Sequence, residues 1–239
     1  MASATGIPEQ VPASSEQEPL LGRPGDATQQ SDQGLYYNFF TGTAILAQVG
    51  VWILAAIIWA AIFEHGVMFF SAHPLLQSAG VLFLVQAILI VQPTATQKQK
   101  RDGTWAHSAL NFVGVGALVA GVVVIELNKA PHPDQRFKSP HGILGMITFG
   151  LICIQAIVGF VQYWTPSLLG GVDNGKALYK YHRVSGYTVL FAALATVATA
   201  TQTDFNKNVL GVRLWAVLVA IVLVLIGIIP RVKPAKLGF

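Results

Sequence analysis

The sequence has few charged residues and almost no cysteine, and both shortages narrow the class of protein. Only 11% of its 239 residues are charged and 53% are hydrophobic, whereas an ordinary soluble domain has about 25% charged residues. A soluble globular protein is therefore excluded. The single cysteine, Cys153, lies in an apolar run. The chain can therefore form no intrachain disulfide, no cysteine-ligated zinc site and no iron–sulfur cluster.

Charged residues are also missing from the interiors of six long apolar runs. Since about 20 apolar residues cross a hydrocarbon core of ~30 Å, these runs predict six transmembrane helices, at residues 41–63, 74–91, 106–125, 141–163, 184–201 and 214–229. The predicted fold class is all-α, a polytopic membrane protein. Ion-coupled transporters and proton pumps place a carboxylate or a lysine at mid-membrane depth, so its absence argues against both.

The polar residues inside the runs are amides, and we expect them to form hydrogen bonds between helices. They are Gln48, Gln77, Gln86, Asn111, Gln155 and Gln162. Three glycines of the third run, Gly114, Gly116 and Gly121, either permit close helix approach or leave room for a flat cofactor. The sequence does not choose between these two uses.

The apolar region is flanked by two tails. We interpret residues 1–35 as a disordered cytoplasmic tail, 36–230 as the transmembrane domain and 231–239 as a short basic cytoplasmic tail. The first tail has no basic segment followed by an apolar one, so it is not a cleavable signal peptide. Residues 16–21, Glu-Gln-Glu-Pro-Leu-Leu, resemble an acidic dileucine signal for an endosomal, lysosomal or vacuolar membrane; a tail without a sorting role is the alternative.

Lysine and arginine predict the orientation of the helices. Six spans put both termini on one side of the membrane. That side carries ten Lys and Arg residues and the other side five. Because basic residues are retained in the cytoplasm, we expect both termini to be cytoplasmic.

Four of the six histidines stand at the starts of successive runs: His73, His107, His141 and His182. Because consecutive spans run in opposite directions, His73 and His141 should lie near the outer surface and His107 and His182 near the inner one. Two imidazoles at equal depth can fill both axial positions of a haem iron. The two layers therefore predict two haem b groups, held without covalent bonds because the chain has no Cys-x-x-Cys-His string.

The other two histidines, His65 and His132, lie in predicted loops without a partner at matched depth. We interpret them as interfacial polar residues. A lone histidine at a helix start is most often a cap or an interfacial residue, but that interpretation must explain a histidine on each of four successive spans. The repetition favours ligation for those four.

The segments around the four histidines resemble the cytochrome b561 family, in its short form with no appended domain. They read SAHPLL (71–76), WAHSALNFVG (105–114), SPHGILG (139–145) and YKYHRVSGY (179–187), and the resemblance covers about residues 36–230. It implies a haem-binding four-helix bundle formed by the second to fifth spans, with the same ligand pairs. It also implies a transmembrane oxidoreductase that moves single electrons from cytoplasmic ascorbate to monodehydroascorbate or ferric iron on the other side.

Two departures from the family pattern concern the substrates. The outer motif Ser-Leu-His-Ser-Trp-x-Gly is kept at Ser139, His141 and Gly145, but Ile143 stands at the tryptophan position. Ascorbate-reducing members carry a basic stretch rich in Arg and Tyr after the second span, where this chain has AILIVQPTATQKQKR (87–101). The second departure leaves the identity of the electron donor open.

Six basic residues near the two layers are candidate substrate contacts: Lys98, Arg101, Arg136, Lys138, Lys180 and Arg183. Lys180 and Arg183 flank His182 and would attract an anionic reductant such as ascorbate. Arg136 and Lys138 would receive an anionic acceptor or a ferric chelate on the outer face. Membrane retention and contacts with lipid headgroups are the alternative for all six.

Two other classes of function remain open. A haem-free membrane adaptor that displays the N-terminal tail would be colourless. A haem subunit that exchanges electrons with a quinone or a partner oxidoreductase would contain haem but ignore ascorbate. In each case we expect the lipid bilayer and no nucleic acid as a partner, and a homodimer is one arrangement that the sequence allows.

Overall fold

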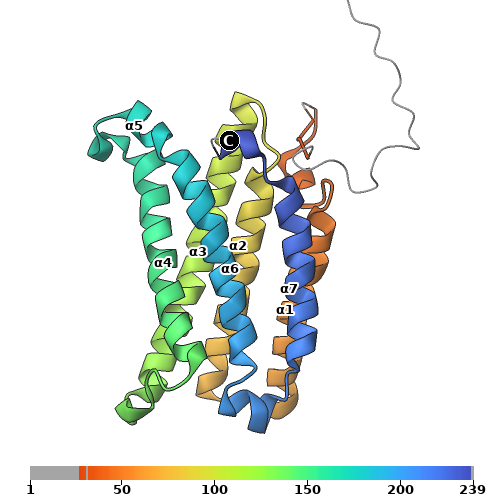
Figure 1. The fold of residues 1–239 in the computed structure, drawn as a ribbon, viewed down its shortest axis with the longest axis vertical. Helices are drawn as coiled ribbons and strands as arrows, with labels where there is room; N and C mark the ends of the chain where they lie inside the picture. Colours follow the sequence, from red (N-terminus) through yellow and green to blue (C-terminus); the bar gives the residue numbers. More distant parts are fainter. Residues whose placement is uncertain (1–26, 31, 238–239) are drawn as a thin grey trace, which may run out of the picture.

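Six long helices form the body of the protein in a computed structural model that describes residues 27–30 and 32–237 (Figure 1). Its α-helices are α1 (Ala44–His65), α2 (Ala72–Val91), α3 (Gln97–Lys129), α4 (Pro140–Trp164), α5 (Val172–Ala177), α6 (Tyr179–Ala200) and α7 (Leu214–Ile228). No strand occurs among the described residues. Six segments are long and apolar enough to cross a membrane, which confirms the predicted all-α polytopic class.

Some helix boundaries differ from the hydropathy prediction, and polar residues explain the largest difference. α3 begins at Gln97 rather than at 106 because Thr96 and Gln99 form a capping box. The Gln99 N–H donates to Thr96 Oγ1 (3.2 Å), and the Thr96 N–H donates to Gln99 Oε1 (3.1 Å). α6 likewise begins at Tyr179 rather than at 184, and the short helix α5 lies in a predicted loop. Hydropathy detects the apolar part of a helix but not its polar end.

The long helices pack as antiparallel neighbours, α1 with α7, α2 with α3 and α4 with α6 (Figure 1). Most of the buried core lies among α1, α2, α6 and α7, with Val51, Val85, Leu194 and Val224 at its centre. A Cβ on Gly50 would lie 2.6 Å from the Ala220 carbonyl oxygen, so only glycine allows α7 to approach α1 this closely. α4 stands at the edge of the bundle beside α6 and has little contact with α3.

Two of the three glycines of α3 serve close helix approach. A Cβ on Gly114 would lie 3.0 Å from the Phe83 Cβ, and one on Gly121 would lie 2.7 Å from Gln77 Nε2. Both glycines therefore let α3 approach α2. A Cβ on Gly116 would meet no described atom within 4 Å, so this position leaves open space.

Amides inside the bundle connect neighbouring helices, except at Asn111 and Gln162. Gln48 of α1 and Gln86 of α2 exchange two hydrogen bonds of 2.7 and 2.9 Å. Gln77 of α2 donates to a carbonyl of α3 (3.0 Å). Asn111 instead donates to the carbonyl of His107 in its own helix. The expected helix-to-helix role therefore applies to the three glutamines with these hydrogen bonds and not to Asn111 or Gln162.

Both described ends of the chain lie at one end of the bundle, which we call the terminal side (Figure 1). Residues before α1 pack across this end: the Gln29 N–H donates to the Pro93 carbonyl (3.0 Å), and Asn38 Nδ2 donates to the Ile90 carbonyl (2.7 Å). Arg231, only 2% exposed, donates to the Asn38 carbonyl (3.0 Å). The last carbonyls of a helix lack partners within it, so this segment satisfies the end of α2. The described part of the predicted disordered tail is thus folded, and the dileucine-like residues 16–21 lie outside the described residues.

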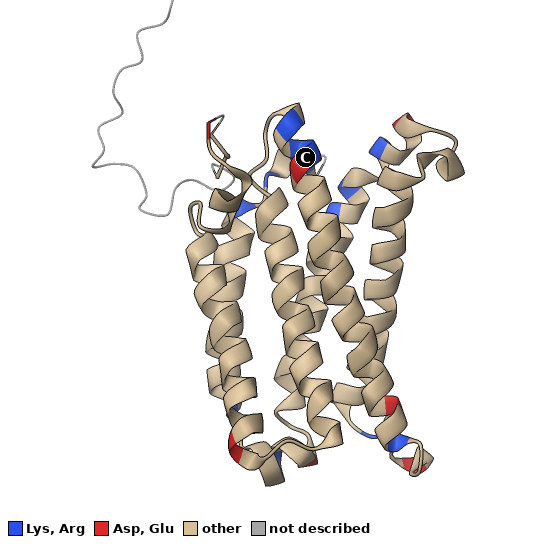
Figure 2. Ribbon diagram, turned by 180° about the vertical axis from the view of Figure 1, so that it is seen from behind, with Lys and Arg blue, Asp and Glu red and all other residues tan. Residues whose placement is uncertain are grey.

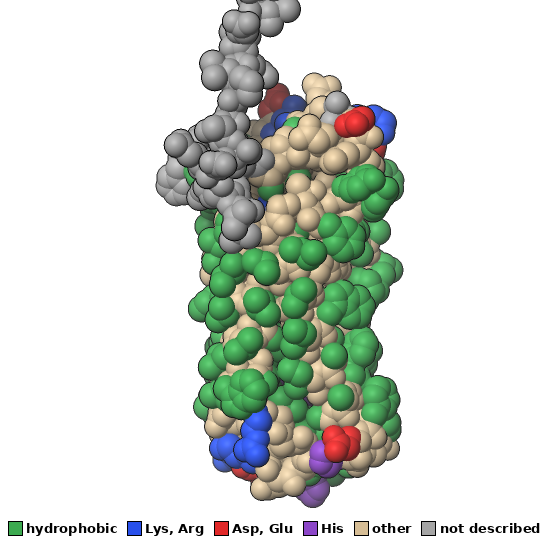
Figure 3. Space-filling model, turned by 90° about the vertical axis from the view of Figure 1, so that its right-hand side faces the viewer, with side chains coloured by type: hydrophobic (Ala, Val, Ile, Leu, Met, Phe, Trp, Pro, Cys, Tyr) green, Lys and Arg blue, Asp and Glu red, His purple; other side chains and the backbone are tan. Residues whose placement is uncertain are grey.

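Charged residues gather at the two ends of the bundle (Figure 2), and apolar side chains cover the length between them on the face that Figure 3 shows. Large apolar residues are exposed along this length, among them Phe112, Ile147 and Trp215. A continuous apolar surface of this extent is unfavourable in water, and its length suits the hydrocarbon core of a bilayer. We call the end away from the termini the opposite side.

Candidate functional site

The four histidines of the successive spans meet in two pairs. The ring centres of His73 and His141 are 6.3 Å apart with their planes at 78°. Those of His107 and His182 are 6.4 Å apart with their planes at 80°. The structure brings together the pairs that the topology predicts, although His107 lies inside α3 rather than at its start, because α3 begins early.

The separation within each pair fits a metal ion between two imidazoles. Metal–imidazole bonds in proteins are about 2.0–2.1 Å, as for zinc. With about 1.2 Å from the nitrogen to the ring centre, two such bonds in line set the ring centres about 6.4 Å apart. The observed values are 6.3 and 6.4 Å. The spacing of each pair therefore fits a haem iron, which the two imidazoles of that pair would hold.

Hydrogen bonds to backbone carbonyls orient three of the four rings. The Nδ1–oxygen distances are 2.9 Å for His73 and Gly121, 2.7 Å for His107 and Ala87, and 3.0 Å for His141 and Thr196. A carbonyl oxygen only accepts, so Nδ1 carries the proton and Nε2 keeps its lone pair in each ring. This tautomer, with its N–H bonded to an acceptor, is typical of histidines that ligate metals.

Each of the four helices carries a paired histidine and, fourteen residues away, a residue that contacts a histidine of the neighbouring helix. The positions are His73 and Ala87 on α2, His107 and Gly121 on α3, His141 and Gln155 on α4, and His182 and Thr196 on α6. Fourteen residues make about 3.9 helical turns, so both positions lie on one face, about 21 Å apart along the axis. Each histidine contacts the second position of the neighbouring helix. One pair of rings therefore lies near the terminal side and the other near the opposite side.

Two residues of α4 touch His182, and the sequence analysis gave neither of them a functional role. Gln155 Nε2 lies 3.1 Å from His182 Nδ1. A Cβ on Gly159 would lie 2.8 Å from His182 Cε1, so the missing side chain makes room for the ring. Finding these residues requires the register between α4 and α6, which no pattern in the sequence supplies.

The remaining two histidines lie apart from the pairs. His65 is the last residue of α1, not a loop residue as predicted, and its Nδ1 lies 2.8 Å from the Ala61 carbonyl oxygen. His132 is exposed and precedes the short 3-10 helix Pro133–Gln135. Among the described residues, no three His, Cys, Asp or Glu side chains converge as a separate metal site.

Some of the basic residues proposed as substrate contacts form ion pairs with carboxylates, and others form none with any described residue. Lys98 and Arg101 share Asp102, with N–O distances of 2.9 and 3.3 Å. On the opposite side Arg136 pairs with Glu126 at 3.1 Å. Such partly exposed pairs add little stability, but each carboxylate weakens the attraction of the neighbouring cation for an anion.

Lys180 and Arg183, at the start of α6, form no ion pair within the described part of the chain. The Lys180 Nζ lies 5.0 Å from the ring centre of Tyr181, and the Arg183 guanidinium lies 6.0 Å from that of Tyr179. Arg183 Nη1 also donates to the Lys236 carbonyl (2.8 Å). These two cations therefore keep their positive charge beside the terminal-side pair of rings.

Lys236 lies in the segment after α7 and is held against the loop between α2 and α3. Its Nζ donates to the carbonyls of Gln92 (3.4 Å) and Thr94 (3.0 Å). Burial, with a smaller effect of three nearby cations, lowers the pKa of Lys236 to about 8. The segment after α7 thus crosses the terminal side next to Arg183.

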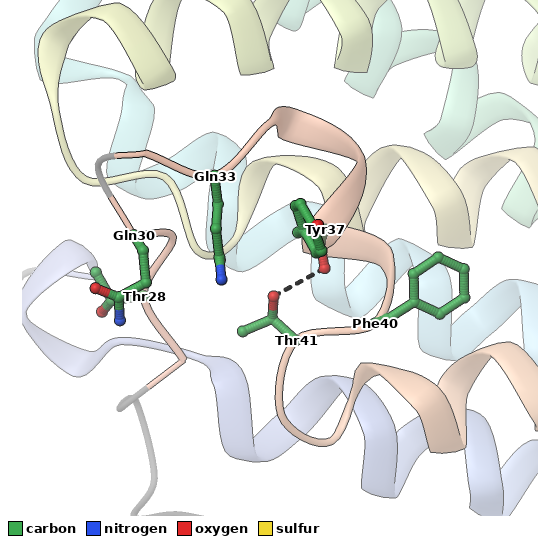
Figure 4. Close-up of a pocket in the computed structure, with 6 residues that line it drawn as sticks. All are labelled: Thr28, Gln30, Gln33, Tyr37, Phe40 and Thr41. Carbon is green, nitrogen blue, oxygen red and sulfur yellow. Dashed lines mark hydrogen bonds between the residues drawn. The ribbon is translucent and has the colours of Figure 1, made fainter.

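A hollow of about 300 Å³ also opens on the terminal side, in the segment before α1 (Figure 4). Its lining is polar and aromatic: Thr28, Gln30, Gln33, Tyr37, Phe40 and Thr41. Within it, Thr41 Oγ1 donates to the Tyr37 carbonyl (2.8 Å). The lining includes no charged residue and none of the paired histidines, so we do not assign this hollow to the functional site.

The sequence of this chain is similar to those of known membrane proteins. A family model described as eukaryotic cytochrome b561 matches residues 72–207, which include all four paired histidines. A Caenorhabditis elegans protein named as a transmembrane ascorbate-dependent reductase CYB561 homologue is 26% identical over 196 residues, 75% of this chain and 72% of that protein. Ascorbate-specific transmembrane electron transporter 2 of Zea mays is 27% identical over 150 residues, 58% of this chain and 61% of that protein. The chain therefore belongs to the eukaryotic cytochrome b561 family, membrane proteins that bind haem b and transfer electrons across the bilayer.

Proposed function

We propose that this protein transfers electrons through two haem b groups, from ascorbate on the terminal side to monodehydroascorbate or ferric iron on the opposite side. The observation that carries the proposal is the arrangement of four histidines in two pairs of equal spacing. His73 and His141 would hold one group, and His107 and His182 the other. Haem b supplies one-electron redox chemistry, and two imidazole ligands leave no vacant coordination position for oxygen or substrate.

The chain's own contribution is to hold the rings and to keep water away from them. Three backbone carbonyls orient three rings, and Gln155 meets the fourth. Because the four helices are apolar along their length, the rings lie in a medium of low dielectric. No Asp, Glu, Lys or Arg stands on α2, α3 or α4 between the two levels of rings, and α6 has only Arg183 there, next to His182 at the terminal-side level. We therefore expect the electron to cross without a coupled proton.

Charge supports a cytoplasmic location for the terminal side. The described residues there include nine Lys and Arg against three Asp and Glu, whereas the opposite side has five against four (Figure 2). Basic residues are retained in the cytoplasm, so this asymmetry favours both ends facing it. A cytoplasmic tail would also expose residues 16–21 where sorting signals are read, which supports an endosomal, lysosomal or vacuolar membrane.

Lys180 and Arg183 are the best candidates for the contact with ascorbate. Ascorbate is an anion at neutral pH, and a positive surface raises its local concentration. The names of both relatives refer to ascorbate, which supports the same reductant here. Lys98 and Arg101 are weaker candidates because both pair with Asp102. The stretch after α2 lacks the Arg- and Tyr-rich sequence of ascorbate-reducing members, and part of it is occupied by contacts with residues before α1.

On the opposite side we assign the acceptor to the loop between α3 and α4. Lys138 is exposed there, and it lies close in sequence to His141. Arg136 is a weaker candidate because it pairs with Glu126. A cation without a carboxylate partner attracts an anionic acceptor or a ferric chelate more strongly.

Transfer across vesicles tests the proposal. With ascorbate enclosed on the terminal side, an impermeant ferric chelate outside should be reduced, one electron for each Fe³⁺ converted to Fe²⁺. The rate should rise when the membrane potential is dissipated, because negative charge leaves the donor side. A haem-loaded protein that shows no ascorbate-driven reduction would contradict the proposed donor and favour a quinone or a partner oxidoreductase.

A further inference from the structure

His182 differs from the other three paired histidines in what its Nδ1 contacts. Gly121, Ala87 and Thr196 each present a backbone carbonyl to a histidine ring of the neighbouring helix. These are three of the four positions that lie fourteen residues from a paired histidine. At the fourth position the side chain of Gln155, rather than a backbone carbonyl, contacts His182 Nδ1. His182, in the terminal-side pair, is therefore the one paired histidine whose Nδ1 contacts a side chain instead of a backbone carbonyl.

The difference is chemical as well as geometric. A backbone carbonyl can only accept a hydrogen bond, so it holds the proton of a ring on Nδ1. A carboxamide can present either an acceptor oxygen or a donor nitrogen, depending on how it is turned. At His182 the tautomer of the ring is therefore set by a side chain, which substitution can change, whereas the carbonyls at the other three rings persist whatever side chain stands there.

The carboxamide of Gln155 is held from several directions. Its Nε2 lies 2.6 Å from the His182 carbonyl oxygen as well as 3.1 Å from Nδ1. Its Oε1 accepts from Ser185 Oγ (2.7 Å), and a hydroxyl can donate to or accept from an amide in either orientation. A Cβ on Gly186 would lie 3.0 Å from Nε2, so glycine leaves room for the amide between α4 and α6.

A ligating His182 needs its proton on Nδ1 and an acceptor facing it. Gln155 can present Oε1 as an acceptor to His182 Nδ1 only if its amide turns over. The hydrogen bond from Nε2 to the His182 carbonyl is then lost. The loss of this bond offsets part of the free energy that the new contact contributes. The acceptor contact at His182 is therefore weaker than the carbonyl contacts at the other three rings.

We propose that Gln155 is a positioning residue that sets the hydrogen bond, and through it the electron donation, of His182. The proposal rests on the proposed function, in which His182 is an iron ligand. A stronger acceptor at Nδ1 makes an imidazole more basic and favours the ferric state, and loss of the acceptor has the opposite effect. The terminal-side pair is therefore the one whose midpoint potential responds to a single side chain.

Redox titration of the haem-loaded protein tests the proposal with two substitutions that act in opposite directions. Gln155→Glu supplies a fixed acceptor and should favour the ferric state of one haem about tenfold, a fall of about 59 mV for a one-electron couple. Gln155→Leu removes the acceptor and should raise the potential of the same haem. The low-spin electron paramagnetic resonance signal of that haem should shift in both variants, and the signal of the other haem should not.

Gln48→Leu is the matched control, since it removes a buried glutamine that bonds between helices but touches no paired histidine. It should leave both potentials unchanged. The affected haem is identified as the one that His182→Ala removes. Loss of that haem alone in Gln155→Leu would also support the proposal. Unchanged potentials in both Gln155 variants, or equal effects on both haems, would overturn it, whereas a wild type with fewer than two haems would instead contradict the proposed function.

Discussion

Gly159→Ala should displace His182 and remove the terminal-side haem while leaving the protein folded. The added Cβ would lie 2.8 Å from His182 Cε1, whereas ordinary contacts begin at 3.4 Å. The ring must therefore retreat by the difference, about 0.6 Å, while metal–ligand distances tolerate only about 0.2 Å. We expect haem affinity at this pair to fall about 10- to 100-fold, as for other changes to the surroundings of a metal ligand.

The free energy of unfolding should fall by no more than about 2 kcal/mol in this variant. Overpacking typically costs about 1–3 kcal/mol, and alanine gains about 1 kcal/mol over glycine inside a helix. The haem-to-protein ratio and the thermal unfolding of the purified variant measure the two effects separately. Gly150→Ala is the control on the same helix, because its Cβ would meet no described atom within 4 Å. A Gly159→Ala protein with the wild-type haem content and spectrum would refute the placement of the ring.

Replacing Lys180 and Arg183 by glutamine should slow ascorbate-driven reduction several-fold at low ionic strength but leave reduction by an uncharged reductant unchanged, and salt should abolish the difference. Equal slowing with both reductants would mean that these residues do not attract the anion. Because the pKa of Lys236 falls from 10.5 to about 8 on folding, the unfolded segment holds more protons between these values, so its anchoring should strengthen as pH rises from about 8 to 10. Proteolysis of residues 232–237 should slow over that range, Lys236→Met should remove the dependence, and a wild type without it would contradict the buried amine. A tag at either terminus should be reached from the cytoplasmic side only, and tags on opposite sides would contradict the orientation.

The membrane spans and the histidine pairs could be predicted from the sequence because both depend on patterns that it displays. Apolar runs of sufficient length identify the helices, and alternation of direction assigns His73 and His141 to one level and His107 and His182 to the other. The polar start of α3 could not be predicted by hydropathy, since it depends on the bonds between Thr96 and Gln99.

The surroundings of the rings could not be predicted in the same way. The acceptor for His73 is the carbonyl of Gly121, and every residue type carries that group, so the sequence contains no signal for it. Gln155 has a distinctive side chain, but its role depends on how α4 is placed against α6. The contacts of residues 27–30 could not be predicted because their polar composition resembles that of a disordered tail, whereas the Gln29 N–H donates to the Pro93 carbonyl just after α2.

Haem content per chain, measured by pyridine haemochrome on the purified protein and its histidine variants, tests the central claim most directly. The two pairs predict two haems in the wild type, loss of the same single haem in His107→Ala and His182→Ala, and two haems in His65→Ala. One haem or none in the wild type, or full haem content in either of the two ligand variants, would contradict the account.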